Sequence, residues 1–353
     1  MKVLFDHQIF YKRYGGASKY FVKMIESMPA DSWTTTTLMS NNEYVKATGL
    51  FKSYRNLFKG QSILLDYINR PYTNWLLSRQ NFDIFHQTNF GTYCIKSLGN
   101  KPMVTTYHDS NLSTIDYHPE IVKLQEKSIK RADKIIVVSE NTKKDLIRLF
   151  DVSESRVEVI YHGIDIPETG RFSAKTLYDF PYVLYVGRRS EYKNFTNFVK
   201  AFSLLREHNH ELKAVCTFKP FNRNEMELFH DLGVSEDILY VGADEEMMLQ
   251  LYHQAELFVF PSLYEGFGMP ILESWACNCP VVLSDASCFP EIAGDAGLYF
   301  NPNLVEDIAD KMNCVLNNVE IRNQLIVKGN KRVKMFSWKK CAEKHMQVYQ
   351  SLV

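Results

Sequence analysis

Two glutamates separated by seven residues flank a glycine-containing loop in the stretch EGFGMPILE, which runs from Glu265 to Glu273. The loop follows the apolar run 257–260 and reaches Pro270, a residue favoured at the start of a helix. In a strand, loop and helix arrangement of this kind, backbone N–H groups approach a ligand closely and the positive helix end attracts negative charge. The chemistry that the stretch suits is phosphate binding.

The two carboxylates indicate what is attached to that phosphate. Glu265 lies in the loop, and Glu273 is expected in the first helical turn. A carboxylate repels phosphate but accepts hydrogen bonds from hydroxyl groups, and the usual hydroxyls beside a diphosphate belong to a ribose or a sugar. The ligand implied is a nucleotide sugar. A tight left-handed turn with a glutamate at the helix start would give the same residues without a ligand.

A basic cluster follows the apolar run 182–186. Arg188, Arg189 and Lys193 come soon after it, and Asn194 is expected to cap the next helix. Arginine offers paired donors and lysine a movable charge, so the cluster could clamp a diphosphate that gains charge as it leaves. A solvated helix start is the alternative, which is weakened because that end of a helix repels cations. The spacing leaves both arginines as candidates, with Arg189 preferred.

Two loops in the first half of the chain also follow short apolar runs. One contains Lys12, Arg13 and Gly16 and leads into an amphipathic helix. The other begins with His108 and Asp109. Loops at the carboxyl ends of parallel strands share one edge of a sheet, where ligands bind.

His108 has the position of a functional residue because it directly follows a buried strand predicted over 103–107. It could hydrogen-bond a sugar hydroxyl or carry a proton, although many such histidines are satisfied core residues. His7, His86 and His118 have no comparable position and are interpreted as structural.

The elements that carry these loops alternate between strand and helix along the chain. This rhythm predicts α/β domains with doubly wound parallel sheets, and 353 residues suit two domains of Rossmann size. The aperiodic stretch 161–170 serves as the linker, so the first domain covers 1–166 and the second 171–337. Two loops of the second domain could reach the nucleotide base, and their candidate residues are Phe218, Lys219 and Gly242.

The stretch EGFGMPILE resembles the signature of the retaining glycosyltransferases of family 4, which have the GT-B fold. The resemblance covers nearly the whole chain, most strongly over 182–296 and most loosely over 41–80. Within this family, the chain resembles enzymes of the mannosyltransferase type that build bacterial polysaccharide and lipopolysaccharide. The resemblance implies two Rossmann-like domains facing across a cleft, with the acceptor on the first and the donor on the second. The last helix, 338–353, would pack back on the first domain.

The resemblance also implies a role for each candidate residue. Glu265 and His108 would be catalytic, Glu265 by orienting sugar hydroxyls and His108 by contacting the transferred sugar, while Glu273 would hold the ribose. The donor-binding residues would be Gly16, Arg188, Arg189, Lys193, Gly266, Phe267, Gly268, Met269 and Glu273. The acceptor side would contain Lys12, Arg13 and Asp109.

Composition excludes several other classes of protein. Lysine plus arginine and aspartate plus glutamate both number 41, which argues against a nucleic-acid-binding protein that works through bulk charge. The seven cysteines contain no CxxC pair, so neither a disulfide framework nor a zinc site is indicated. No Asp-x-Asp pair is present to hold a metal against a diphosphate. We therefore expect no metal and no cofactor, with the nucleotide sugar as co-substrate.

No apolar run reaches the length of a membrane span, so we expect a protein that is soluble or at most peripheral to a membrane. The absence of a disulfide pattern indicates a cytoplasmic protein. Residues 41–80 nevertheless mix basic and aromatic residues, with helical spacing over 62–77. Such a helix could lie on the anionic inner face of a cell membrane, where a lipid-linked glycan acceptor would be found. A solvated helix that packs on its own sheet is the commoner structure for this pattern.

Two other functions share much of this pattern. A nucleotide-sugar epimerase of GT-B fold would convert a donor without any acceptor, and a catalytically silent partner subunit would bind the donor without releasing nucleotide. A Rossmann dehydrogenase is disfavoured because the first loop lacks the GxGxxG pattern.

Overall fold

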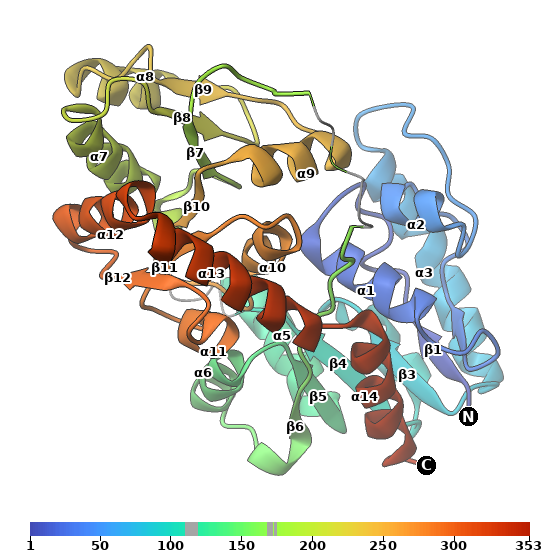
Figure 1. The fold of residues 1–353 in the computed structure, drawn as a ribbon. Helices are drawn as coiled ribbons and strands as arrows, with labels where there is room; N and C mark the ends of the chain where they lie inside the picture. Colours follow the sequence, from blue (N-terminus) through green and yellow to red (C-terminus); the bar gives the residue numbers. More distant parts are fainter. Residues whose placement is uncertain (110–118, 168–171, 173–174) are drawn as a thin grey trace. The chain divides into compact units, whose positions relative to one another are not determined.

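The computed structural model describes residues 1–109, 119–167, 172 and 175–353 (Figure 1). The chain divides into two compact units, one formed by Met1–Gly163 with Phe336–Val353 and the other by Ile164–Met335. Each unit contains a six-stranded sheet in which all the neighbouring strands are parallel. The predicted fold class, two doubly wound α/β domains, is confirmed. Part of the predicted linker, 168–170, lies outside the described residues.

The first sheet has the strand order β2-β1-β3-β4-β5-β6. Chain order reverses between β1 and β3, and the crevice beyond the carboxyl ends of such strands is the usual ligand site. β1 leads to the loop that precedes Gly16, the first residue of α1, and β4 leads to His108. The strands are β1 (Val3–Phe5), β2 (Trp33–Thr35), β3 (Ile84–Gln87), β4 (Met103–Tyr107), β5 (Lys134–Val137) and β6 (Val157–Val159).

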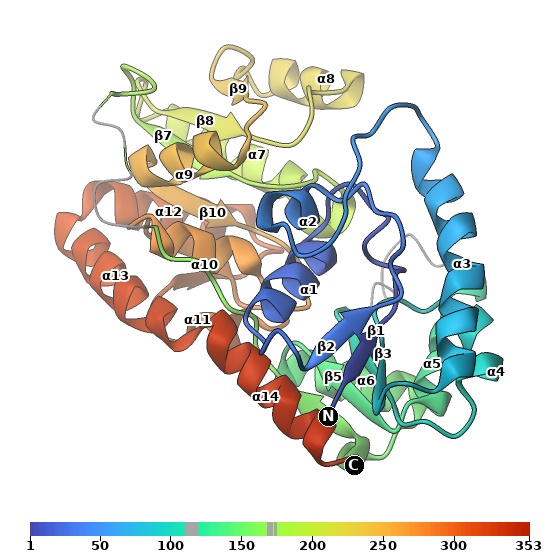
Figure 2. The ribbon, with the colours of Figure 1, turned by 90° about the vertical axis from the view of Figure 1, so that its right-hand side faces the viewer.

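Side-chain caps fix several helices around this sheet. Asn42 accepts hydrogen bonds from two backbone N–H groups at the start of α2, and Ser139 caps α6 as predicted. α3 is the longest of these helices and packs against α4 (Figure 2). The helices are α1 (Gly16–Glu26), α2 (Glu43–Thr48), α3 (Gln61–Arg79), α4 (Ile95–Leu98), α5 (Pro119–Arg131) and α6 (Glu140–Phe150), with short 3₁₀ turns at Thr92–Cys94 and Glu154–Arg156.

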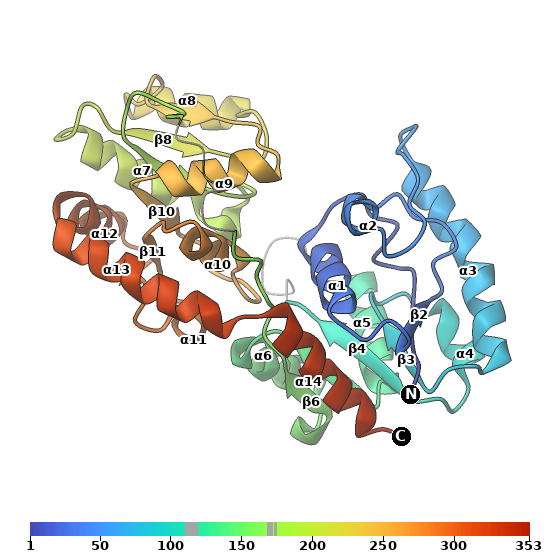
Figure 3. The same ribbon diagram turned by 45° about the vertical axis from the view of Figure 1, so that its right-hand side comes forward.

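The last helix, α14 (Trp338–Gln350), belongs to the core of the first unit and packs against α1 (Figure 3). His345 Nδ1 donates to the carbonyl of Cys341 at 2.8 Å, which leaves its Nε2 to accept from the Tyr20 hydroxyl at 2.7 Å. His86 lies 2.6 Å from the Tyr349 hydroxyl. Buried polar groups with partners of this kind fix the helix in one position. The structural interpretation of His86 fits these contacts, whereas His118 lies outside the described residues.

The second sheet has the strand order β12-β11-β10-β7-β8-β9. β7 and β10 are neighbours, although 71 residues lie between the end of β7 at Tyr185 and the start of β10 at Leu257. Val183 pairs with Leu257, and Leu184 pairs with Phe258. The loops that follow these two strands therefore leave the same edge of the sheet side by side. The strands are β7 (Tyr182–Tyr185), β8 (Lys213–Cys216), β9 (Ile238–Tyr240), β10 (Leu257–Phe260), β11 (Val281–Ser284) and β12 (Leu298–Phe300).

Apolar residues fill both faces of the second sheet, as expected for strands covered by helices on each side. All four residues of β10 are buried, and α7 packs closely with α12 over one face of the sheet (Figure 1). The helices are α7 (Phe195–Arg206), α8 (Arg223–Asp231), α9 (Glu245–Gln254), α10 (Met269–Ala276), α11 (Phe289–Ala293), α12 (Val305–Asn317) and α13 (Val319–Arg332), with 3₁₀ turns at Glu191–Lys193 and Val333–Met335.

Candidate active site

The loops after β7 and β10 are joined by an ion pair. The ammonium group of Lys193 lies against the carboxylate of Glu265, and the two side chains are 16% and 15% exposed. The Leu263 N–H also donates to the Tyr192 carbonyl at 2.7 Å. Two residues that the sequence marks as candidates are thus brought together at the carboxyl edge of one sheet, where a ligand is expected.

The backbone of Glu265 is held as firmly as its carboxylate. The hydroxyl of Ser287 donates to the Glu265 carbonyl at 2.7 Å, and the Glu265 N–H lies 3.2 Å from the same hydroxyl. Ser287 is itself in a left-handed conformation in the loop after β11. The carboxylate therefore occupies a defined position before any ligand binds, which is the preorganisation that a binding site requires.

The start of α10 depends on Gly268. This residue has a φ of +92°, and a Cβ atom built on it would lie 3.0 Å from Ile271 Cδ1, so only glycine fits without strain. The helix begins at Met269 with Pro270 in its first turn. Gly266 and Gly268 are buried and Phe267 is 4% exposed, so this loop is packed closely into the second unit. The first N–H groups of a helix lack partners within the helix and favour an anion.

Glu273 lies one turn further into α10 than the sequence predicts. The helix starts at Met269, so Glu273 is its fifth residue, and the first turn contains no acidic residue. The hydroxyl of Tyr252, on α9, donates to the Glu273 carboxylate at 3.3 Å. Burial, and then the neighbouring Glu273, raise the pKa of Tyr252 well above its ordinary value, so Tyr252 remains a hydrogen-bond donor. The pair presents a half-buried carboxylate held by a phenol.

The two adjacent arginines have different environments. Arg189 has a side chain only 5% exposed and pairs with Glu225 at 2.7 Å. Its guanidinium also donates to three carbonyls of the loop after β8, those of Thr217, Lys219 and Pro220, at 2.9, 2.7 and 3.0 Å. Arg188 is exposed. Arg189 therefore fixes a loop, and Arg188 is the arginine that is open to a ligand.

Lys193 ends the 3₁₀ turn that precedes α7. Asn194 occupies the N-cap position of this helix, but its side chain makes no capping bond and instead donates to the Pro302 carbonyl at 2.7 Å. The predicted side-chain cap is therefore wrong. Asn194 has a left-handed backbone with a φ of 56°, which turns the chain between the 3₁₀ turn and the helix.

His108 belongs to the first unit, where it follows β4. Its ring lies 5.0 Å from that of Tyr20 and 5.9 Å from that of Phe21. Burial, followed by the charges of His345 and Lys12, lowers the pKa of His108 to about 4. The shielded Nε2 atom has no hydrogen-bond partner among the described residues. At neutral pH this side chain is an uncharged imidazole that can make a further hydrogen bond.

We expect NMR to show a neutral His108 over the whole physiological range. The ring resonance that disappears in the His108→Gln variant should keep its chemical shift from pH 8 down to pH 5.5, because the folded protein takes up this proton only near pH 4. A midpoint between pH 6 and 7 would show that the imidazole is not shielded as described. The pH dependence of that single resonance is the measurement.

The other candidates of the first unit lie before and at the start of α1 and in the loop after β4. Gly16 is the first residue of this helix, is exposed, and would carry a Cβ atom into open space. Arg13 pairs with Glu43 at 3.2 Å, and burial lowers the pKa of Lys12. Asp109 is half-buried beside His108. All of these residues lie in the first unit, whereas the loops after β7 and β10 lie in the second.

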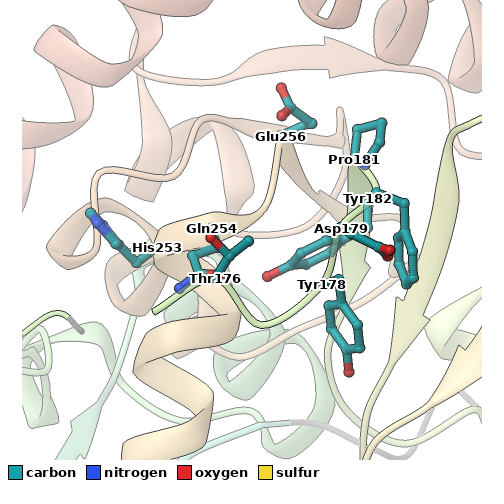
Figure 4. A pocket seen from close by; sticks show the side chains of 9 residues that line it. Thr176, Tyr178, Asp179, Pro181, Tyr182, His253, Gln254 and Glu256 are labelled. Atoms are coloured by element: carbon teal, nitrogen blue, oxygen red, sulfur yellow. The ribbon is translucent and has the colours of Figure 1, made fainter. Parts of the chain in front are cut away.

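A hollow of about 670 Å³ in the second unit lies at the opposite edge of its sheet, where β7 and β10 begin (Figure 4). Its polar groups already stabilise the fold. Gln254 accepts from the Leu177 N–H and donates to the Lys175 carbonyl, and Glu256 forms an ion pair with Arg322. None of the candidate residues selected from the sequence lines this hollow. Those of the second unit lie at the carboxyl edge of the sheet.

Several supporting residues could not be selected from the sequence. Tyr252, Ser287 and Glu225 act by holding Glu273, Glu265 and Arg189, and each is distant from its partner along the chain. The one local signal concerns Glu225, which forms a capping box with Asn222 at the start of α8. In the described ranges, no group of three or more His, Cys, Asp or Glu side chains is placed to hold a metal ion. Within the same ranges, no helix is long and apolar enough to cross a membrane.

Comparisons with known proteins identify the family and the fold of the chain. Residues 14–168 match the family model "Glycosyltransferase Family 4", and residues 168–332 match "Glycosyl transferases group 1". The chain is 31% identical over 297 residues to the O-antigen chain mannosyltransferase B of Escherichia coli, an alignment that covers 79% of this chain and 77% of the relative. It is 27% identical to the O-antigen chain mannosyltransferase RfbU of Salmonella typhimurium, over 58% of this chain and 62% of that protein.

Among solved structures, HepE of Anabaena in complex with UDP and glucose is similar over the full length of both chains. The TM-score is 0.79 and the sequence identity 16%. At this identity the likeness shows a shared fold.

Proposed function

Because the chain belongs to the family 4 and group 1 glycosyltransferases, with the GT-B fold, we propose that it moves a hexose from a nucleoside-diphosphate sugar to a glycan or lipid-linked glycan. Mannose is the first candidate for the transferred sugar, with GDP-mannose as its donor, because both relatives named above are mannosyltransferases. The setting would be the assembly of a bacterial surface polysaccharide. We propose a cytoplasmic enzyme.

The observation that carries the proposal is the ion pair between Lys193 and Glu265 beside the start of α10. A donor bound there would place its diphosphate against the Lys193 ammonium group and the helix N-terminus. The Glu265 carboxylate would accept hydrogen bonds from the sugar hydroxyls. Before binding, each charge compensates the other, so neither is left unpaired in a partly buried position. Glu273, supported by Tyr252, would accept the ribose hydroxyls.

The leaving nucleoside diphosphate gains negative charge as the glycosidic bond breaks. We propose that Arg188 and Lys193 stabilise this negative charge. Arg189 is not included, because its guanidinium already holds the loop after β8. The backbone N–H groups around Gly268 would add to the stabilisation. With two cations and a helix end available, the proposed reaction needs no divalent metal.

The proposed reaction retains the configuration of the anomeric carbon. The bond from that carbon to the diphosphate oxygen breaks, the acceptor hydroxyl oxygen bonds on the same face, and its proton passes to the departing diphosphate. Glu265 would help to stabilise the oxocarbenium-like transition state. His108, as a neutral imidazole, would hydrogen-bond the sugar. Lys12, Arg13 and Asp109 would contact the acceptor.

The proposal is tested by incubating the protein with GDP-mannose, UDP-glucose or UDP-N-acetylglucosamine, each with and without a polyprenyl-diphosphate-linked sugar. We expect one donor to give an elongated product whose new linkage has the anomeric configuration of the donor by NMR. Conversion of a donor without an acceptor would favour an epimerase. Donor binding without release of nucleotide would favour a silent partner subunit.

Activity should be insensitive to removal of divalent metal. We expect the transfer rate after dialysis against EDTA to remain within about twofold of the untreated rate, because side chains and a helix end take the place of the metal. Rates are compared before EDTA, after it, and after addition of Mg²⁺ or Mn²⁺. Loss of transfer that either metal restores would refute the assignment of Arg188 and Lys193 to the leaving group.

The segment from Leu57 to Trp75 in the first unit fits an anionic membrane surface. Leu57, Ile63 and Tyr67 expose 78%, 66% and 67% of their surface. Exposed apolar residues that gather beside positive charges are typical of a segment that lies in a lipid interface. Two basic residues, Lys59 and Arg70, lie within this segment, and Arg70 is paired with Asp66. Lys52, Arg55 and Arg79 flank the segment on its two sides.

We therefore propose that the first unit binds anionic lipid, and we expect the protein to sediment with phosphatidylglycerol vesicles but not with phosphatidylcholine vesicles. The triple variant Leu57→Gln, Ile63→Gln, Tyr67→Gln should bind about tenfold more weakly, since each exposed side chain would bury apolar area in the interface. The matched control is Leu304→Gln, an exposed leucine of the second unit. Equal sedimentation of the triple variant and the wild type would contradict the proposal.

A further inference from the structure

One aromatic residue of the second unit has a backbone conformation that aromatic residues rarely adopt. Phe218, directly after β8, has a φ of +93°. The other described residues with positive φ, glycine apart, are polar and lie between 50° and 60°: Gln80, Asp151, Asn194, Asn278 and Ser287. Glycine would take the conformation of Phe218 without strain. A large ring in such a position indicates a role for the ring.

The surrounding loop holds this strained conformation in place. Arg189 donates to the carbonyls of Thr217 and Lys219, which stand on either side of Phe218, and to that of Pro220. Glu225 fixes Arg189 and also accepts from the Asn222 N–H at 2.7 Å. Because several bonds determine the path of the loop, the backbone at Phe218 cannot relax without breaking them.

The ring of Phe218 contacts cations. It is 45% exposed, so it does not fill a core. The Cζ atom of Arg188 lies 5.7 Å from the ring centroid, and the Nζ atom of Lys219 lies 5.3 Å from it. β8 is the neighbour of β7 in the sheet, so the loop that carries Phe218 and the loop that carries Arg188 leave the same edge. Contacts with two cations suit recognition of an anion better than stacking on a neutral base.

We propose that Phe218 is a positioning residue that holds the guanidinium of Arg188 ready for the diphosphate of the donor. An exposed arginine samples many rotamers, and fixing one of them when a ligand binds lowers affinity. Stacking on an aromatic face restricts the guanidinium beforehand. Arg189 acts one step further away, because it sets the loop that carries Phe218. This inference rests on the proposed assignment of Arg188 to the diphosphate.

The test is a double-mutant cycle on Phe218 and Arg188, with the nucleoside diphosphate that raises the melting temperature most among GDP, UDP and ADP. Calorimetry gives its Kd for the wild type, Phe218→Gly, Arg188→Gln and the double variant. We expect Phe218→Gly to melt at the same or a higher temperature, because the strain is relieved. Its Kd should nevertheless rise about two- to fivefold, the change that an exposed cation–π contact produces. Phe218→Tyr, which keeps an aromatic ring, should have the wild-type Kd.

The outcomes separate this inference from the proposed function. If Arg188→Gln leaves the Kd unchanged, the assignment of Arg188 is wrong and the inference falls with it. If Arg188→Gln weakens binding and Phe218→Gly does not, only the inference is overturned. An equal effect of Phe218→Gly with and without Arg188 would mean that the ring acts alone, and would also overturn it. A smaller effect in the Arg188→Gln background supports it.

Two controls complete the cycle. Inorganic pyrophosphate as a competing ligand should lose affinity in Phe218→Gly as the nucleoside diphosphate does, because the proposed contact is with the diphosphate and not with the base. Unchanged pyrophosphate affinity would overturn the inference in favour of base stacking. Asp151→Gly relieves the backbone strain of a left-handed residue at the end of α6 in the first unit, and it should leave the Kd at its wild-type value.

Discussion

The Glu265→Gln variant is expected to lose about 10²- to 10³-fold in kcat, the typical effect of removing one charged or polar group that stabilises a transition state. Glutamine has nearly the same shape, so the sugar hydroxyls would still find an acceptor. The negative charge that stabilises an oxocarbenium-like centre would be gone. The KM for the donor should change much less than kcat, because the diphosphate contacts of Lys193 and Arg188 remain.

Steady-state transfer assays over a range of donor concentrations measure this split between kcat and KM. Glu246→Gln, an exposed glutamate near the start of α9 in the same unit, serves as the matched control and should keep wild-type kinetics. Circular dichroism shows whether the variant is folded, since Lys193 loses its partner in Glu265→Gln. A folded Glu265→Gln protein with wild-type kcat would remove Glu265 from the chemistry.

The second large effect is expected for Glu273→Ala, which should weaken nucleoside-diphosphate binding about ten- to a hundredfold. Hydrogen bonds to a charged group contribute about 1.5–3 kcal/mol each, and the proposed ribose contact depends on this carboxylate. The kcat at saturating donor should change little. This pattern is the reverse of that expected for Glu265→Gln.

A change in the ligand provides a sharper form of the same experiment. Wild-type protein should prefer a nucleoside diphosphate over its 2′,3′-dideoxy analogue, and Glu273→Ala should bind both with similar affinity. Tyr252→Phe, which removes the hydroxyl that holds the Glu273 carboxylate, should give an intermediate result. If Glu273→Ala still discriminates between the two ligands as the wild type does, another group recognises the ribose.

The local features of the fold follow from the sequence, because they depend on neighbouring residues. The buried strand Met103–Tyr107 has the predicted bounds, and α10 begins with the glycine and proline that such a turn requires. The polar strand Trp33–Thr35 and the short helix Glu43–Thr48 give no periodic signal, and the sequence predicts neither.

The site itself required the tertiary structure. The contact between Lys193 and Glu265 depends on β7 and β10 being neighbours, which no local pattern states. The different environments of Arg188 and Arg189 depend on carbonyl groups of the loop after β8 and on Glu225. Adjacent residues of the same type cannot be distinguished by spacing alone, since partners far along the chain decide which side chain is buried.

Hydrogen–deuterium exchange with and without the nucleoside diphosphate tests whether this ligand binds at the carboxyl edge of the second sheet. We expect slower exchange in the loop after β7 and in the loop that leads into α10, around Lys193 and Gly268, with no change at the hollow around Tyr178 and Gln254. Slower exchange at that hollow, with the two loops unaffected, would show that the nucleoside diphosphate binds at the opposite edge of the sheet.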